Sequence, residues 1–350
     1  MVTGGLGYIG SHTCINLLAK GYHLIVIDSL INSSKVVVDK IMQISKIPLE
    51  KSQSYFSFIK GDLRDKNFLN NVFKKYCNKD EKIEAVIHFA GLKSVVESTM
   101  LPLKYWDFNV TSTINLLKVM ENYKCFRFVF SSSATIYGAK ETNISIKESD
   151  PIKPINTYGK TKEVIENILE SLVNIHNNRW RIAVLRYFNP IGAHDSGLIG
   201  ENPIITPTNI VPIINKVAAN QIKRFPIYGN DWDTADGTCV RDYIHVMDLA
   251  ESHLKALEYT KKDKSLILKL NIGTGKGTSV LQLLNTFEKV NKVKIPYELT
   301  SRRDGDLPYS VADNLEAKIK LNWEPSRNLE TMCKDSWNWY KNNLKGGVDF

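Results

Sequence analysis

Two kinds of segment alternate over the first 130 or so residues, and this alternation limits how the chain folds more than any other feature. Short runs rich in β-branched residues predict strands at 24–27, 55–60, 85–89 and 127–131. Amphipathic stretches between them predict helices at 9–20, 36–45, 66–76 and 102–123. A chain that alternates in this way builds a parallel sheet with helices on both faces. We therefore predict an α/β, doubly wound fold.

The residues at the start of the first predicted helix read TGGLGYIG. Gly4, Gly7 and Gly10 have no side chains, so the backbone there can approach a pyrophosphate, whose charge the helix dipole favours. The next predicted strand ends in Asp28, and a carboxylate at this point accepts from a ribose 2′-hydroxyl and repels a 2′-phosphate. These features together predict a Rossmann-type sheet that binds NAD rather than NADP.

The same residues allow a simpler interpretation, in which a glycine-rich turn merely packs a helix on a strand and Asp28 is an exposed loop acid. The number of fingerprint parts that occur together favours the dinucleotide site. Only three residues precede Gly4. We therefore expect either a chain that starts further upstream or a first strand reduced to a stub, which would weaken the centre of the sheet.

The pattern changes in the second half of the chain. A helix at 158–177 and a strand at 181–186 are still predicted, but beyond Asn189 prolines and the stretch 228–237 indicate long loops. We expect an NAD-binding domain over 1–187 and a smaller C-terminal α/β substrate domain over 188–350, with some segments interleaved.

A tyrosine and a lysine four residues apart carry the predicted chemistry. Tyr158 and Lys162 share one face of their helix, and Ser133 closes a strand at the carboxyl edge of the sheet, where α/β proteins bind ligands. To act as a base at neutral pH, a phenol needs its pKa lowered by about 3 units, or about 4 kcal/mol. A nearby ammonium and an oxidised nicotinamide can supply that charge. Alone, the pair is typical of an exposed helix face and the serines of a turn, but their order after the dinucleotide fingerprint favours catalysis.

The chain resembles the UDP-galactose 4-epimerase family over essentially its full length. The segments that carry the resemblance are TGGLGYIGSHT, HFAGLKSV, SSSATIYG, YGKTK, RYFNPIGAH, DGTCVRDYIHVMDLA and RRDGDLP. The resemblance implies that Tyr158 is the catalytic acid and base, that Ser133 is its hydrogen-bonding partner, and that Lys162 binds the nicotinamide ribose and lowers the tyrosine pKa.

The resemblance also implies where cofactor and substrate bind. Besides the three glycines, Tyr158 and Lys162, it assigns to NAD the residues Tyr8, Ile9, Asp28, Asn32, Asp62, Leu63, Phe89, Ala90, Gly91, Lys93, Asn109 and Phe188. Besides Ser133, Tyr158 and Lys93, it assigns to a UDP-sugar the residues Asn189, Asn209, Tyr228 (uracil), Arg241 and Arg303 (diphosphate), Asp306 (ribose) and Ser310. The arginines fit independently, because a guanidinium matches phosphate oxygens, although each alone is also typical of a surface salt bridge.

Several activities share this set of residues. An epimerase must hold the nucleotide of its substrate firmly while the 4-keto sugar rotates to present its other face. Because the same NAD returns the hydride, NAD is expected to stay bound throughout. Dehydratases and decarboxylases of this superfamily carry an acid just after the catalytic hydroxyl, where this chain has Ala134 and Thr135. A UDP-glucuronate 4-epimerase, another NAD-dependent sugar-nucleotide enzyme and a non-catalytic NAD-binding scaffold remain as alternatives.

Ser310 lies near the point where the family closes its sugar pocket with a side chain that is bulky in some members and small in others. A serine leaves room, so we expect UDP-N-acetylglucosamine and its galacto epimer to be accepted as well.

Composition narrows the setting. The net charge of +9 comes from lysines spread along the chain, which predicts a solvated surface and no nucleic-acid partner. The cysteines are scattered, no metal-ligand spacing occurs, and the apolar stretches are too short to cross a bilayer. We expect a cytoplasmic protein with no metal and no membrane partner. The family resemblance implies a homodimer formed through helices 102–123 and 158–177.

Overall fold

The computed structural model describes residues 1–48, 54–78, 82–138, 144–175, 179–203, 209–262, 264–303 and 305–345. Contacts divide the chain into two compact units, each of which is described by itself. Unit 1 comprises Met1–Gly138, Pro151–Arg186 and Ser252–Leu270, and unit 2 comprises Ala139–Asp150, Tyr187–Glu251 and Asn271–Phe350. The chain thus crosses between the units several times, where the sequence suggested one main boundary at 187/188 with some interleaving.

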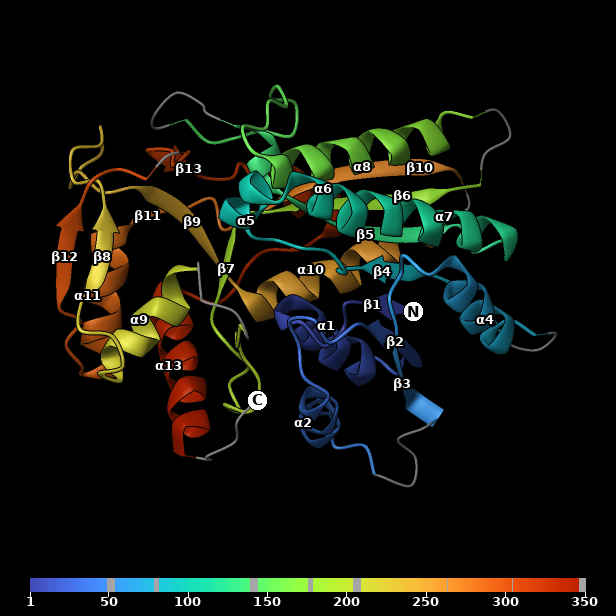
Figure 1. Ribbon diagram of the computed structural model, residues 1–350, viewed down its shortest axis with the longest axis horizontal. Helices are drawn as coiled ribbons and strands as arrows, with labels where there is room; N and C mark the ends of the chain where they lie inside the picture. Colours follow the sequence, from blue (N-terminus) through green and yellow to red (C-terminus); the bar gives the residue numbers. More distant parts are fainter. Residues whose placement is uncertain are drawn as a thin grey trace. The chain divides into compact units, whose positions relative to one another are not determined.

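A seven-stranded sheet forms the centre of unit 1 (Figure 1). The strand order is β10-β6-β5-β4-β1-β2-β3. The strands are β1 (Val2–Thr3), β2 (Leu24–Asp28), β3 (Phe56–Lys60), β4 (Val86–His88), β5 (Arg127–Ser133), β6 (Arg181–Tyr187) and β10 (Leu266–Ile272). β1 pairs in parallel with β2 and with β4, so the strand order reverses direction at β1. In sheets of this kind ligands bind at such a reversal, beyond the carboxyl ends of the strands.

The central strand β1 is short but fully paired. Val2 lies opposite Val26 on one side and Ile87 on the other, and Thr3 lies opposite Ile27 and His88. The amino group of Met1 donates to the carbonyl of Ala85 at 2.8 Å, which extends the contact with the segment leading into β4.

Helices connect these strands. They are α1 (Tyr8–Ala19), α2 (Val36–Ser45), α4 (Lys66–Tyr76), α5 (Val95–Met100), α6 (Pro102–Tyr105), the π-helical turn η1 (Trp106–Thr111), α7 (Ser112–Asn122), the short η2 (Ala134–Ile136), α8 (Thr157–Val173) and α10 (Val246–Tyr259). The predicted α/β class is confirmed, and most predicted elements agree with these bounds to within one or two residues. Residues 176 and 177, which the prediction placed in the helix of Tyr158, lie outside the described part of the chain. Within the described residues, no helix is long and apolar enough to cross a membrane.

One predicted helix is wrong in detail. The segment 102–123 is not a continuous α-helix, because it passes through a π-helical turn at Trp106–Thr111 before α7 begins. Such a turn occurs within otherwise α-helical segments, and it is common at functional sites. Here it carries Asn109, whose side chain is buried.

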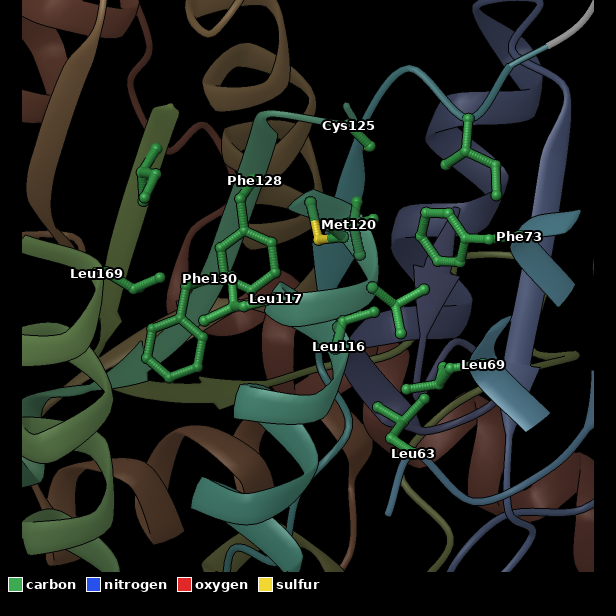
Figure 2. Close-up of a cluster of buried hydrophobic side chains, with 14 of the residues drawn as sticks. Leu63, Leu69, Phe73, Leu116, Leu117, Met120, Cys125, Phe128, Phe130 and Leu169 are labelled. Atoms are coloured by element: carbon green, nitrogen blue, oxygen red, sulfur yellow. The ribbon is translucent and has the colours of Figure 1, made fainter. Parts of the chain in front are cut away.

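A continuous apolar core fixes α4, α7 and α8 against the sheet (Figure 2). Phe128 and Phe130 point from β5 toward Leu116, Leu117 and Met120 of α7, while Leu69 and Phe73 approach from α4 and Leu169 from α8. Each fully buried leucine or phenylalanine contributes roughly 1.5–3 kcal/mol of transfer free energy. The ends of β5 and α8 therefore rest on a close-packed support.

Unit 2 combines small sheets with helices. Its strands are β7 (Asn189–Ile191), β8 (Phe225–Tyr228), β9 (Val240–His245), β11 (Gly277–Ser279), β12 (Tyr297–Thr300) and β13 (Tyr309–Ser310), and its helices are α9 (Ile210–Ala218), α11 (Val280–Asn291), α12 (Leu315–Leu321) and α13 (Leu329–Lys345). β9 is the central strand, since it pairs with β7, β11 and β13, while β8 pairs with β12.

A buried carboxylate organises the middle of unit 2. Asp242 on β9 accepts hydrogen bonds from the backbone of Thr274, Gly275 and Ala312 at 2.7, 2.9 and 3.2 Å, and from the Thr274 hydroxyl at 2.6 Å. Burial raises its pKa and these hydrogen bonds oppose the rise. The glycine-containing loop 273–277 is thus a tight turn wrapped around Asp242, next in sequence to Arg241.

Candidate active site

The turn between β1 and α1 accepts only glycine at two points. Gly4 has φ +66°, and a Cβ there would lie 2.6 Å from the backbone nitrogen of Ala90. A Cβ on Gly10 would lie 2.3 Å from the carbonyl oxygen of Gly4. Because these neighbours are backbone atoms, they cannot rotate away. The glycines therefore bring the start of α1 close to the carboxyl edge of β1.

The N-terminus of α1 is open to an anion. Its N-cap residue is Gly7, no side chain caps the helix, and no acidic residue lies in its first turn. The first backbone N–H groups of a helix have no acceptor within it, and the helix dipole adds positive potential. Tyr8 and Ile9 begin the helix at this point. The turn fits a diphosphate, as the sequence predicted.

Asp28 ends β2 beside this turn. Its Oδ2 accepts from the backbone N–H of Leu6 at 3.0 Å, and its Oδ1 accepts from the Leu30 N–H at 3.0 Å and the Ser33 hydroxyl at 2.7 Å. The side chain is nearly buried, whereas Asn32 in the following loop is exposed. A carboxylate so close to the glycine turn fits a ribose with a free 2′-hydroxyl and disfavours a 2′-phosphate.

The end of β3 adds a second acidic residue. Asp62 accepts from the backbone N–H of Arg64 at 2.9 Å and pairs with its guanidinium at 2.7 Å. The hydrogen bond from Arg64 holds the pKa of Asp62 below its usual value. Arg64 also pairs with Asp107 at 2.7 Å. The side chain of Leu63 is buried in the core (Figure 2), so only its backbone is available to a ligand.

Asn109 fixes the loop that follows β4. Its Oδ1 accepts from the Leu92 N–H at 2.8 Å, and its Nδ2 donates to the Leu92 carbonyl at 3.1 Å and to the Thr161 hydroxyl at 3.0 Å. The side chain therefore links this loop to α8. The other predicted cofactor residues of this segment are Phe89, Ala90, Gly91 and Lys93, of which Gly91 and Lys93 are exposed.

Tyr158 stands in the first turn of α8. Asn156 caps this helix by accepting from the Gly159 N–H at 2.8 Å, and the backbone N–H of Tyr158 donates to the Ser98 hydroxyl at 3.1 Å. Ser133, at the end of β5, makes a hydrogen bond with the phenol that lowers the phenol's pKa. The structure thus brings together the tyrosine and the serine that the sequence predicted.

Thr135 orients Ser133 and was not predicted. Its N–H and its hydroxyl both donate to the Ser133 oxygen, at 3.3 and 2.8 Å. A hydroxyl that accepts two hydrogen bonds has its own proton left to donate, here to Tyr158. The available sequence signal was a second hydroxyl two residues after Ser133, but SSSAT is also typical of an ordinary strand end.

Lys162 alone does not lower the pKa of Tyr158, and the contribution expected from an oxidised nicotinamide stays a prediction. Burial raises the pKa of Tyr158 to about 12, against a lowering by the hydrogen bond with Ser133. Lys162 does not reverse this, because its Nζ lies 5.8 Å from the centre of the Tyr158 ring and donates to the carbonyl of Ser131 at 2.7 Å. Burial lowers the pKa of Lys162 to about 8, and the charge of Glu166 opposes that change.

Unit 2 gathers the residues predicted to bind a sugar nucleotide. Arg303 pairs with Asp306 at 3.2 Å, and its guanidinium lies 4.9 Å from the centre of the Tyr228 ring, at the end of β8. Arg241 on β9 lies 3.8 Å from Asp306 and donates to the Leu307 carbonyl at 2.7 Å. Two guanidinium groups therefore share one carboxylate beside an exposed aromatic ring.

The remaining predicted residues of unit 2 are placed as follows. Ser310 lies on β13, paired with Arg241 of β9, and is partly buried. Asn189 begins β7, opposite Tyr243. Asn209 is the N-cap residue of α9, and its amide donates to Glu201. Phe188 is buried and belongs to unit 2 with them, although it was predicted to contact the cofactor.

Comparisons with known proteins identify the family of the chain. The family model described as GDP-mannose 4,6 dehydratase matches residues 1–336. UDP-glucose 4-epimerase of Bacillus subtilis is 46% identical over 346 residues, which are 99% of this chain and 98% of that protein.

Solved structures extend the likeness to the fold. UDP-glucose 4-epimerase from Stenotrophomonas maltophila, crystallised with NAD and formylated UDP-arabinopyranose, is 40% identical with a TM-score of 0.92, covering 99% of this chain and 98% of that one. The Bifidobacterium longum enzyme, in complex with NAD+ and UDP, is 42% identical with a TM-score of 0.90 and the same coverage. The chain belongs to the family described by the GDP-mannose 4,6 dehydratase model, a group of extended short-chain dehydrogenases, and within it to the UDP-glucose 4-epimerases.

Proposed function

We propose that this protein interconverts UDP-galactose and UDP-glucose by inverting C4 through a transient 4-keto sugar, with NAD bound. The observation that carries the proposal is the Tyr158 hydroxyl, held by Ser133 at the carboxyl edge of a dinucleotide-binding sheet with Lys162 one turn away. Membership of the UDP-glucose 4-epimerase family supports it. Bound NAD supplies the acceptor and donor of the hydride at C4.

The chain's residues hold the cofactor and move a proton. The open N-terminus of α1 takes the diphosphate and Asp28 takes the adenosine ribose. Tyr158 Oη accepts the proton of the sugar C4 hydroxyl as the hydride leaves, and it returns that proton to the 4-keto oxygen when the hydride comes back to the other face. When the sugar is bound, Ser133 directs its one proton to this sugar oxygen instead of to Tyr158, and the charge of Lys162 stabilises the phenolate.

The predicted substrate residues bind different parts of the sugar nucleotide. Arg241 and Arg303 bind the diphosphate and Tyr228 stacks on the uracil, while Asn189, Asn209 and Asp306 contact the remainder of the nucleotide. Asp306 already pairs with both arginines, which leaves one net positive charge for a ligand. An incoming diphosphate therefore replaces an existing ion pair, which supports selection of a strong anion.

Two further properties are part of this proposal. Ser310 leaves space for a 2-acetamido group, so UDP-N-acetylglucosamine and its galacto epimer are also substrates. The protein is a cytoplasmic homodimer: its five cysteines are unpaired, which suits a reducing compartment. Leu103 of α6 is 82% exposed and Met100 is 73% exposed, as apolar residues are where a partner covers them. Light scattering of the purified protein measures the dimer.

The experiment that tests the function is turnover of UDP-galactose by purified protein, with UDP-glucose separated and measured by chromatography. Tyr158→Phe should lower kcat by roughly 10²–10⁴-fold, the usual contribution of an acid and base, and should retain NAD. Tyr297→Phe, at an exposed tyrosine of β12, should leave turnover unchanged. Wild-type protein that carries NAD but forms no UDP-glucose would contradict the proposal.

A further inference from the structure

Three consecutive serines at the end of β5 each contact a different turn of α8. Ser133 is hydrogen-bonded to Tyr158, and the Ser131 carbonyl accepts from Lys162 at 2.7 Å. The Ser132 hydroxyl, between them, donates to Glu166 Oε1 at 2.5 Å. Tyr158, Lys162 and Glu166 are spaced four apart, so they form one stripe along the helix. The third member of this stripe has no part in the chemistry described above.

Glu166 is held from the neighbouring strand by an arginine. Arg186 of β6 donates from Nε to Oε1 at 3.1 Å and from Nη2 to Oε2 at 2.7 Å, which is the forked geometry that fixes a carboxylate in two dimensions. The Nη1 of the same guanidinium donates to the Tyr137 hydroxyl at 2.7 Å. Glu166 is 0% exposed and Arg186 is 1% exposed. The carboxylate therefore has little freedom to turn away from Ser132.

A buried ion pair of this kind is weak evidence for stability. Taking both charges out of water costs free energy that their attraction roughly recovers, and apolar replacements are often as stable. What the pair provides in return is a fixed direction for each of its hydrogen bonds. One of those bonds reaches the backbone segment that presents Ser131 and Ser133.

The charges around Lys162 make Glu166 important for a second reason. Burial lowers the pKa of Lys162 to about 8, and Glu166 opposes this. On β4, burial keeps His88 neutral by lowering its pKa to about 3. On β6, Arg186 is paired with Glu166, and on β10, Lys269 lies 3.8 Å from Glu166 and pairs with Glu170. On β5, the Phe130 ring lies 4.8 Å from Lys162 Nζ. Among these groups, the Glu166 carboxylate favours the charged lysine.

We propose that Glu166 is a positioning residue of the epimerase, which fixes the β5 end through Ser132 and lies one turn from Lys162 on the same face of α8. The inference rests on the proposed function, because Tyr158, Lys162 and Ser133 have their roles only there. It predicts that removing either the hydroxyl of Ser132 or the charge of Glu166 acts on the catalytic rate rather than on substrate binding.

The gentler test removes only the Ser132 hydroxyl. Ser132→Ala leaves the Glu166–Arg186 pair in place and should lower kcat roughly tenfold, the loss of one hydrogen bond to a charged group, with KM changed by less than about twofold. The matched control is Ser171→Ala, because Ser171 is on the same helix and its hydroxyl donates only to the helix carbonyl of Asn167 in the described contacts. A Ser132→Ala enzyme with wild-type kcat would overturn the positioning role.

The second test removes the charge. Glu166→Gln should move the alkaline limb of the kcat profile to lower pH by about one unit, as loss of a nearby opposite charge does. Glu170→Gln is the control, one turn further on and also paired with Lys269 but 44% exposed. Titration of Lys162 by NMR of ¹³C-labelled lysine, in protein freed of NAD, reads the same shift without activity. An unchanged titration contradicts the charge role.

Separate measurements distinguish a folding defect, a failure of the proposed function and a failure of the inference about Glu166. Circular dichroism reports whether Glu166→Gln folds with Arg186 left unpaired. If it does not, the double variant Glu166→Gln with Arg186→Gln is titrated against Arg186→Gln, so that the two proteins differ only in the Glu166 charge. Wild-type turnover of UDP-galactose tests the proposed function. If the wild type turns over and the variants match it, the inference fails alone.

Discussion

Lys162 donates its hydrogen bond to the carbonyl of Ser131, at 2.7 Å, and not to the phenol of Tyr158. The strand end therefore sets the position of the ammonium, whose Nζ lies 5.8 Å from the centre of the phenol ring. Burial raises the pKa of Tyr158 to about 12. A phenolate there therefore needs nearby positive charge, which we expect Lys162 and bound NAD to supply together.

This relationship predicts how the rate depends on pH. Burial lowers the pKa of Lys162 to about 8, so the ammonium loses its proton as the pH rises through that value. We expect kcat/KM to fall on the alkaline side with an apparent pKa at or below about 8, since a bound cation would lower it further. Lys162→Arg keeps its charge to much higher pH, so its weaker activity should lack this limb. Identical alkaline limbs in both enzymes would contradict the assignment.

Substitution of Gly10 tests the NAD site. The Cβ of Gly10→Ala would lie 2.3 Å from the carbonyl of Gly4, so the turn must open and its amides must move. We expect purified Gly10→Ala to carry little NAD, measured by absorbance after denaturation, and to require added NAD for turnover. Gly21→Ala is the control, because its Cβ meets nothing within 4 Å although its φ of +78° adds modest strain. If Gly10→Ala retained as much NAD as the wild type, the glycine turn would not be part of the NAD site.

His88 gives the fold a dependence on acid. It is enclosed between the hydroxyls of Thr3 and Thr113, at 2.7 and 2.9 Å, and burial lowers its pKa to about 3. Below its unfolded pKa near 6.5 the unfolded chain binds a proton that folded His88 does not bind. The free energy of unfolding therefore falls as the pH drops from about 6.5 toward 3, by up to about 1.4 kcal/mol per unit.

Denaturant unfolding at several pH values measures that slope. His88→Gln is less stable overall, since it loses the ring packing with Phe128 and Phe130, but it should lack this one proton's share of the slope. Equal slopes for the wild type and His88→Gln would show that His88 does not titrate as its burial requires.

Substitution of two neighbouring arginines, Arg303 and Arg302, tests which of them binds the substrate. Arg303→Ala removes the guanidinium that lies over Tyr228 and should raise KM for UDP-galactose by roughly tenfold or more, the value of a hydrogen bond to a charged group. Arg302→Ala is the matched control, since Arg302 instead bonds to Asp231 at 2.8 Å and lies 4.0 Å over Trp232. Equal effects of the two substitutions on KM would argue against a diphosphate at Arg303.

The parts of this molecule that were predictable from sequence are those with local signals. Strand and helix alternation gave the doubly wound sheet, and the spacing of Tyr158 and Lys162 placed them on one helix face. The π-helical turn at 106–111 was not predicted, because no glycine interrupts the segment to mark it. The Ser132–Glu166 contact was equally hidden, since it joins residues 34 apart that only the packing of α8 on β5 brings together.

The same limit applies to the ionisation of the site. The sequence gives the reference pKa of a tyrosine and the presence of a lysine, but the sign of the Tyr158 shift depends on burial, which is a property of the folded core. Thr135 and Asn109 illustrate the point for hydrogen bonds. Each is an ordinary polar residue in the sequence and becomes a support of the site through contacts made in three dimensions.

Ser310 offers a test of substrate range. Its backbone pairs with Arg241 across β13 and β9, so a larger side chain can be introduced without changing the strand. Ser310→Tyr should lower kcat/KM for UDP-N-acetylgalactosamine roughly tenfold or more relative to UDP-galactose, because the ring takes the space that an acetamido group needs. Tyr309→Phe is the control: successive side chains of a strand point to opposite faces, so it should change both substrates alike. If wild-type protein turns over both sugars and Ser310→Tyr slows them equally, the space beside Ser310 does not hold the 2-substituent.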